Sequence, residues 1–227
     1  MRYLSRNKVY KKLESNHDAK KIYIICEGSE TEKKYFKYFQ GFSSNIDIIP
    51  IPSENGKTDP LKLKENAEIL FFSKDDIKPK YELSIEYKDE VWFVIDTDNW
   101  NEGNKIEQLR MFCDENNNKF KQWFLAQSNP CFEIWQFYHF NEAKPIDNEV
   151  QNCASFKEFI NTKIKGGFDN RSMPIELEKA IKNSIKNFET ENNQPKLYST
   201  ELHHLGLIIL PFIKEQLDKS REMFQKK

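Results

Sequence analysis

The sequence predicts an α/β protein with a mainly parallel sheet of about four strands, flanked by helices and followed by a helical C-terminal extension. Between residues 22 and 140, short apolar runs alternate with segments of helical periodicity, which is the pattern of strand–helix–strand units. After residue 150 the strand-like runs stop and helix-like segments remain. Glycine is scarce, with 7 in 227 residues, which argues against a loop-rich β-sandwich and favours long helices.

Composition excludes several classes of protein. No run of 18 apolar residues occurs, so no membrane-spanning helix is expected. The positively charged N-terminus lacks an apolar stretch behind it, so it is not a secretory signal. The cysteines are scattered without a Cys-x-x-Cys pair, which is poor material for a zinc site or a disulfide framework. We therefore expect a cytoplasmic protein with reduced thiols.

Charge is uneven along the chain although the net charge is only −1. Residues 1–21 hold seven lysines and arginines against two acids, which gives a local charge of +5. This basic leader is either a flexible solvated segment or an arm that contacts phosphates. The predicted organisation is this leader, an α/β domain over residues 22–145, and a helical region over residues 146–227 that packs on it.

The first unit is a buried strand over residues 22–26, a turn that begins at Glu27-Gly28, and a helix. Ser29 and Glu32 have the spacing of a capping box at the start of that helix. Gly41 is well placed to end it. The turn places Glu27 directly after the carboxyl end of a strand.

A second strand is expected over residues 45–51, and Pro50 restricts it to an edge of the sheet or to its own end. Asp59-Pro60 combines a capping side chain with proline at the first helical position, and it opens a helix that runs to about Ser73. Residues 74–89 form a polar connection to the next strand.

The third strand is the apolar run 91–95, which leads into Asp96 and Asp98. A helix over about 105–116 and a fourth strand over 121–127 follow. Asn129-Pro130 then opens a helix over 131–140 that is apolar on almost all sides and should be buried.

The rest of the chain is predicted to be helical, over residues 155–164, 174–192 and 200–225. Pro211 should kink or divide the last helix. This region either covers a face of the sheet or offers a surface to a protein partner or to a second copy of the chain.

Acidic side chains follow two of the predicted strands. Glu27 ends the first strand, and Asp96 and Asp98 end the third. If these strands are neighbours, the acids face one crevice at the carboxyl edge of the sheet, where open α/β sheets place their ligands. Crowded carboxylates repel one another unless a divalent cation lies between them, and Mg²⁺ prefers such oxygen ligands. The alternative for the aspartates is a turn-initiating Asp with a solvated neighbour. Glu32 is either a fourth ligand or the acid of the capping box.

Four motifs in order carry a family resemblance. They are Cys26-Glu27-Gly28 with Thr31-Glu32 and Tyr35-Phe36, then Asp96-x-Asp98, then Ser128-Asn129-Pro130-Cys131-Phe132-Glu133 with Trp135 and His139-Phe140, and finally the weaker Thr200-x-Leu202-His203-x-Leu205. Together they resemble the RloB-like family over roughly residues 20–215. The resemblance implies a Toprim-type catalytic core, as in primases, topoisomerases and OLD-type nucleases. It also implies a setting in anti-phage loci, linked to abortive infection or restriction, often beside an ATPase partner.

By position, Glu27 matches the first Toprim acid, and Asp96 and Asp98 match the Asp-x-Asp pair that binds Mg²⁺. Glu32 matches the acid of the family's Thr-Glu pair, and Glu133 ends the Ser-Asn-Pro-Cys-Phe-Glu motif. The family often has a basic residue between the aspartates and an acid–His pair after them. Here Thr97, Asn99 and Trp100 stand at those places, which puts any proton-transferring role there in doubt.

The favoured function is a Mg²⁺-dependent nuclease, with Mn²⁺ as an alternative metal, that cuts RNA or DNA. Ions held by Glu27, Asp96 and Asp98 would act as Lewis acids on the water and the phosphate. Glu27 could also act as general base or acid, and a nearby Lys20, Lys21 or Lys33 would contact the phosphate. Glu133 either completes the metal cluster or accepts hydrogen bonds in the core. We expect His139, His203 and His204 to be structural.

Three alternatives remain open. A phosphohydrolase or phosphotransferase would use the first aspartate as nucleophile, but that chemistry usually places the Asp-x-Asp pair after the first strand. A glycosyltransferase would leave Glu27-Gly28 unexplained. The last alternative is a non-catalytic or partner-activated interaction module of a defence complex.

Overall fold

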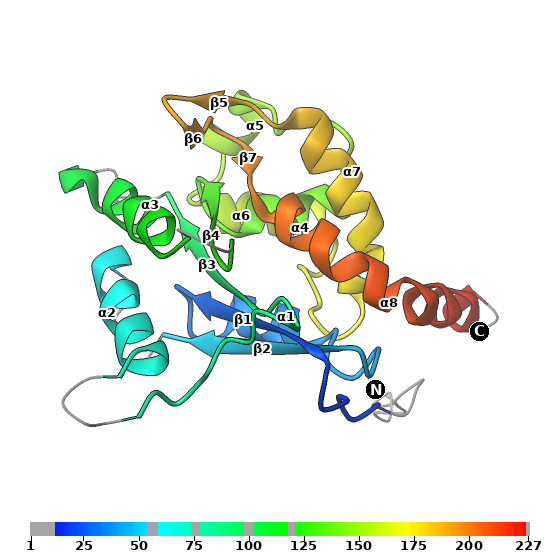
Figure 1. The fold of residues 1–227 in the computed structure, drawn as a ribbon. Helices are drawn as coiled ribbons and strands as arrows, with labels where there is room; N and C mark the ends of the chain where they lie inside the picture. The colour runs from blue at the N-terminus through cyan, green and yellow to red at the C-terminus, as the bar shows by residue number, and fades with distance from the viewer. Residues whose placement is uncertain (1–11, 54–58, 74–77, 98–101, 118–120, 226–227) are drawn as a thin grey trace.

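The computed structural model (Figure 1) describes residues 12–53, 59–73, 78–97, 102–117 and 121–225. Their centre is a five-stranded sheet in the order β2-β1-β3-β4-β7. Its first four members are mutually parallel, and the last pairs antiparallel with β4. The strands are β1 (Lys20–Cys26), β2 (Ile46–Pro52), β3 (Glu90–Asp96), β4 (Trp123–Asn129) and β7 (Ser199–Thr200). The predicted α/β class is therefore confirmed.

Helices cover both faces of the sheet (Figure 1). Alternate residues of a strand point to opposite faces, so Ile22 and Ile24 of β1 belong to one apolar cluster and Tyr23 and Ile25 to the other. The first cluster is completed by α1 (Thr31–Lys37), α4 (Glu133–Tyr138), α7 (Leu177–Asn187) and α8 (Leu202–Gln225). The second is completed by α2 (Pro60–Phe71) and α3 (Lys105–Asn116).

Local signals placed several elements correctly. The Asp59 carboxylate accepts a hydrogen bond of 2.8 Å from the Leu61 amide, and Pro60 is the first residue of α2. β2 pairs only with β1 among the described strands, so it is the edge strand that Pro50 predicts. The predicted bounds of α3 agree with the observed ones.

The predicted capping box is wrong. Helix α1 begins at Thr31 with Glu30 as its N-cap residue, and no side chain caps it. The helix ends at Lys37, and turns lead from there to Gly41, whose φ of 75° lies in the left-handed region. The helix expected over 131–140 is also shorter, because β4 continues to Asn129 and α4 begins only at Glu133.

The C-terminal region contains strands that the sequence pattern did not predict. After α5 (Asp147–Gln151) and α6 (Phe156–Lys163), a short 3₁₀ helix, η2 (Met173–Glu176), leads into α7. A hairpin of β5 (Thr190–Glu191) and β6 (Gln194–Pro195) then precedes β7. Outside the C-terminal region, another 3₁₀ turn, η1 (Glu102–Asn104), lies between β3 and α3. Helix α8 continues through Pro211 without division.

Helices α7 and α8 share the core of the sheet. Leu205 and Ile209 of α8 are buried with Trp92 and Val94 of β3 in one apolar cluster. A smaller cluster joins α4 to α6 and includes Tyr138. In the described part of the chain, none of the helices is both long and apolar enough to cross a membrane.

This packing gives a stability test. Leu205 is fully buried, whereas Leu207, two residues further along α8, is 46% exposed. We expect Leu205→Ala to lower the free energy of unfolding by about 2–5 kcal/mol, because it removes transfer energy and leaves a cavity. The matched change Leu207→Ala should cost no more than about 0.5 kcal/mol. Urea denaturation of both variants measures the difference, and equal losses would contradict the shared core.

Candidate acidic site at the carboxyl edge of the sheet

The candidate site lies between β1 and β3, where the order in which strands are added to the sheet reverses. From β1 the chain passes through α1 to β2 on one side, and from β2 it returns through α2 to β3 on the other side of β1. Such a switch point leaves a crevice outside the carboxyl ends of the two central strands. Glu27 follows β1 and Asp96 ends β3, so the two acids border this crevice.

The structure brings Glu27 and Asp96 together. Cys26 is in register with Val94, and the Glu27 amide continues the pairing by donating to the Val94 carbonyl at 3.0 Å. The Glu27 carboxylate then accepts the backbone amide of Asp96, with Oε2 at 2.8 Å from the nitrogen. Glu27 is only 7% exposed, so this bond fixes a carboxylate that is almost out of contact with water.

The Asp96 carboxylate is fixed from the opposite side. Its Oδ1 accepts the Phe132 amide at 2.7 Å. Phe132 directly precedes Glu133, the first residue of α4, and the Cys131 thiol donates to the Glu133 carboxylate. Burial, followed by the charges of Glu133 and Asp96, raises the pKa of that thiol well above its ordinary value. Glu133 is thus adjacent to the residue that holds Asp96.

Glu32 turns back from α1 over the loop after β1. Its carboxylate accepts the backbone amides of Gly28 and of Glu32 itself. A Cβ atom on Gly28 would lie 2.1 Å from Glu32 Oε2, so glycine leaves the room that the carboxylate occupies. Burial is the main cause that raises the pKa of Glu32, and the negative charge of Glu133 adds to it. Glu32 and Glu133 therefore repel each other.

Two lysines act electrostatically on this acidic group. Lys157, an exposed residue of α6, attracts the charge of Glu32, and Lys33 of α1 acts on the Cys26 thiol at the end of β1. The sequence suggested Lys33, but nothing in the local pattern near residue 157 pointed to the site. Lys20 and Lys21 are wrong candidates. They begin β1, about 20 Å from its carboxyl end at ~3.3 Å per residue, and Lys20 is ion-paired with Glu90.

The comparisons with known proteins give one result. The family model described as RloB-like protein matches residues 22–205. The chain belongs to the RloB-like protein family. Neither the search of curated proteins nor the search of solved structures gave a match. Ser128–Glu133, the segment that carries much of the resemblance, contains the Phe132 amide that holds Asp96.

The donor set suits a hard divalent cation in type, because all its candidate ligands are carboxylates. No ion pair joins Glu32 or Glu133 to a lysine or arginine of the described residues. Over those same residues, no three His, Cys, Asp or Glu side chains converge closely enough to hold an ion. Asp98, the second member of the predicted Asp-x-Asp pair, lies outside the described residues, as do Asn99 and Trp100. The metal site of this RloB-like chain therefore stays a prediction.

Two of the histidines, His139 and His203, have structural surroundings. His139 is fully buried, with Nε2 at 3.0 Å from the Tyr35 hydroxyl and Nδ1 at 2.9 Å from the Trp135 carbonyl. A ring nitrogen that faces a carbonyl must carry the proton, so Nδ1 donates and Nε2 accepts from Tyr35. Burial lowers the pKa of His139 to about 3, and burial with the neighbouring His204 lowers that of His203 to about 4.

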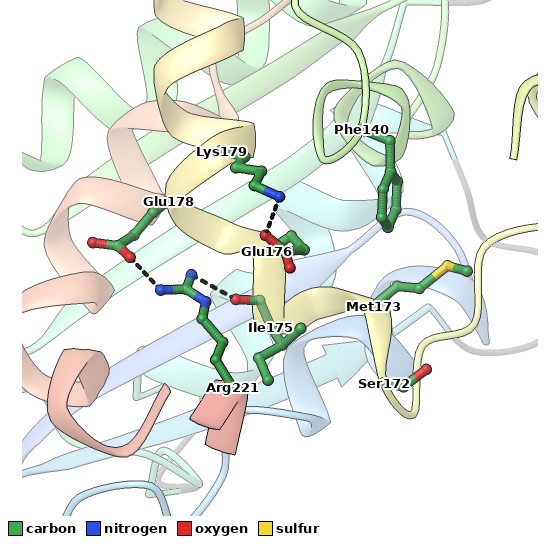
Figure 2. Close-up of a pocket in the computed structure, with 8 residues that line it drawn as sticks. All are labelled: Phe140, Ser172, Met173, Ile175, Glu176, Glu178, Lys179 and Arg221. Atoms are coloured by element: carbon green, nitrogen blue, oxygen red, sulfur yellow. Dashed lines mark hydrogen bonds and ion pairs between the residues drawn. The ribbon is translucent and has the colours of Figure 1, made fainter. Parts of the chain in front are cut away.

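A cavity of about 500 Å³ lies elsewhere in the molecule (Figure 2). It is formed by Phe140, η2, the start of α7 and the end of α8, with Met173 and Ile175 in its wall. Its charged residues are largely paired with one another: Arg221 with Glu178, and Lys179 with Glu176 (Figure 2). None of its lining residues comes from the carboxyl ends of the strands.

The repulsion between Glu32 and Glu133 predicts the effect of removing one charge. Glu32→Gln keeps an oxygen that can accept the two backbone amides but removes the negative charge. In chelator-treated protein at pH 7.5, we expect the melting temperature to rise, by about 2–4 °C for a gain near 1 kcal/mol. Glu222→Gln, at an exposed position of α8, is the matched control. A lower melting temperature for Glu32→Gln alone would show that the charge stabilises the fold.

The buried His139 predicts a loss of stability in acid. Its pKa in the folded protein is about 3, below the ordinary 6.5, so the unfolded chain takes up the proton first. The contribution of His139 is complete above pH 6.5 and decreases as the pH falls toward 3. The free energy of unfolding of His139→Phe, measured between pH 7 and 4, should fall less steeply than that of the wild type. His17→Gln, at an exposed histidine, should keep the wild-type slope; equal slopes for all three proteins would contradict the assignment.

Proposed function

We propose that this protein is a metal-dependent nuclease with a Toprim-type core, which hydrolyses phosphodiester bonds of RNA or DNA. The observation that carries the proposal is the contact between Glu27 and Asp96 at the switch point of the sheet. It supports the proposal because acids on two neighbouring strand ends, fixed by the backbone, are pre-positioned for a cation. Family membership supports it independently.

The acids fall into two groups in this proposal. Glu27 and Asp96 would hold the cation, together with Asp98. Glu32 and Glu133 lie beside them and are the candidates for ligands of a second ion or of its water shell. A bound Mg²⁺ or Mn²⁺ would supply a Lewis acid that lowers the pKa of a coordinated water and polarises the phosphate.

Glu32 is also a candidate for proton transfer. Burial raises the pKa of its carboxyl, which makes the carboxylate a stronger proton acceptor. The hydrogen bonds from the Gly28 amide and its own amide hold the carboxylate in place. Glu32 would then accept a proton from the attacking water, while Lys33 and Lys157 face the negative charge of the phosphate.

The biological setting that we propose is prokaryotic anti-phage defence of the abortive-infection type. An ATPase partner or a second copy of the chain could complete the active particle. Helices α7 and α8 offer surface for such contacts, because each keeps an apolar side chain exposed, Ile185 on α7 and Leu207 on α8. The substrate itself is a nucleic acid whose sugar and sequence the acidic site does not specify.

The proposal is tested by cleavage assays with labelled tRNA, single-stranded RNA and DNA, and duplex DNA, with Mg²⁺, Mn²⁺ or EDTA. We expect cleavage that depends on the metal and that falls by at least about 100-fold in Glu27→Gln and Asp96→Asn, since both changes remove a ligand charge. Asp114→Asn, an exposed aspartate of α3, is the matched control and should cut at the wild-type rate.

Two outcomes would count against this function. Equal cleavage by wild type and both acid variants would remove Glu27 and Asp96 from the site. No cleavage by the wild type, alone or with a candidate ATPase partner added, would favour the non-catalytic interaction module instead.

A further inference from the structure

A chain of partly buried and buried hydrogen bonds leads from α3 and the residue before α8 to the residue after Asp96. It starts at Arg110 of α3, whose Nη2 donates to Gln127 Oε1 at 2.8 Å and to Glu201 Oε2 at 2.8 Å. Gln127 lies on β4 and is fully buried, and Glu201 directly precedes α8. A single guanidinium nitrogen thus joins α3, β4 and the residue between β7 and α8.

Glu201 holds the backbone of Gln127 as a paired strand would. Its amide donates to the Gln127 carbonyl at 2.9 Å, and its Oε2 accepts the Gln127 amide at 2.9 Å. The pairing of β4 with β7 ends at Ser128 and Thr200, so Glu201 extends it by one residue with its side chain. These two bonds oppose a shift of Gln127 along the sheet.

The charge of Arg110 also fixes which way the Gln127 amide points. A guanidinium can only donate, so the amide oxygen must face Arg110 and the NH₂ group must face away from it. That NH₂ group donates to Thr97 Oγ1 at 2.8 Å. Because Oγ1 accepts there, its own proton is directed to the Ser128 carbonyl, at 2.9 Å. The direction of each bond follows from the one before it.

Thr97 is consequently anchored by its side chain and its backbone. Its amide donates to the Ser128 carbonyl at 2.8 Å and to the Pro130 carbonyl at 3.1 Å, and the residue is 5% exposed. Thr97 directly follows Asp96, whose own amide and carboxylate contact Glu27 and Phe132. A shift of Thr97 would move Asp96 away from both contacts.

We propose that Gln127, oriented by Arg110 and Glu201, is a positioning residue: through Thr97 it holds Asp96 against Glu27 in the geometry that binds a divalent cation. The proposal rests on the function proposed above for these acids. In this proposal Gln127, Arg110 and Glu201 do not touch the reacting atoms. Their effect reaches the cation only through the backbone of residues 96 and 97.

The experiment compares four variants by three measurements. Gln127→Met removes the side-chain amide but keeps a side chain of similar length. Thr97→Val removes the hydroxyl but keeps the shape of the side chain, whereas Thr97→Ser keeps the hydroxyl. Ser184→Ala deletes a buried hydroxyl on α7, bonded to the Ile181 carbonyl, and serves as the control. The measurements are hydrogen exchange of the amide of residue 97 by NMR, Mn²⁺ affinity by water proton relaxation, and the melting temperature.

We expect Gln127→Met to speed exchange at residue 97 by at least about tenfold, because the anchor that limits local opening is weakened. Gln127→Met and Thr97→Val should bind Mn²⁺ about 10- to 100-fold more weakly, the usual effect of losing an outer-shell partner. Thr97→Ser and Ser184→Ala should keep wild-type affinity. If the hydroxyl had a merely structural role, Thr97→Val would lower the melting temperature, but its Mn²⁺ affinity would equal that of Thr97→Ser.

Unchanged exchange at residue 97 in Gln127→Met would overturn the anchoring. Faster exchange with unchanged Mn²⁺ affinity, in Gln127→Met and in Thr97→Val, would overturn the positioning role. Failure of the proposed metal site, on which the function rests, looks different, because the wild type would then bind no Mn²⁺ at all. The exchange rates would still decide whether Gln127 holds Thr97.

Discussion

The hydrogen bond from the Asp96 amide to the Glu27 carboxylate is the interaction on which the candidate site depends. It exists only because β1 and β3 are adjacent parallel strands in a register that sets Cys26 beside Val94. Apolar residues packed on both faces make that register costly to change. A slip of one residue would exchange the two apolar faces and separate the acids as well, so the core and the site are specified by the same residues.

Much of this arrangement can be predicted from sequence, because its causes are local. An unbroken apolar run such as 91–95 identifies a strand buried on both faces, and Asp59-Pro60 identifies a helix start. The rule that ligands gather at the carboxyl ends of strands then selects Glu27 and Asp96. Ser29 shows where local signals fail. Its spacing to Glu32 fits a capping box, but the Glu32 carboxylate instead accepts the backbone amides of Gly28 and of Glu32 itself.

Other features depend on contacts that the sequence does not display. β7 has two residues, too few for any alternation, and it is a strand only because β4 lies beside it. The proximity of Glu32 to Glu133, and of Lys157 to Glu32, arises from how α4 and α6 pack. The Phe132 amide that holds Asp96 is a backbone group, so its residue type carries no signal of that role. Asp98 was predicted with Asp96, but its position lies outside the described residues.

Thr97 stands where the family often has a basic residue, and its hydrogen bonds offer a physical reason for this difference. A lysine or arginine beside Asp96 would pair with the carboxylate and compete with a cation for it. Thr97 anchors the same backbone through a neutral hydroxyl. The positive charge in the network, that of Arg110, is balanced by Glu201 and separated from Thr97 by the amide of Gln127. Rigidity is thus supplied without placing a competing cation beside the acids.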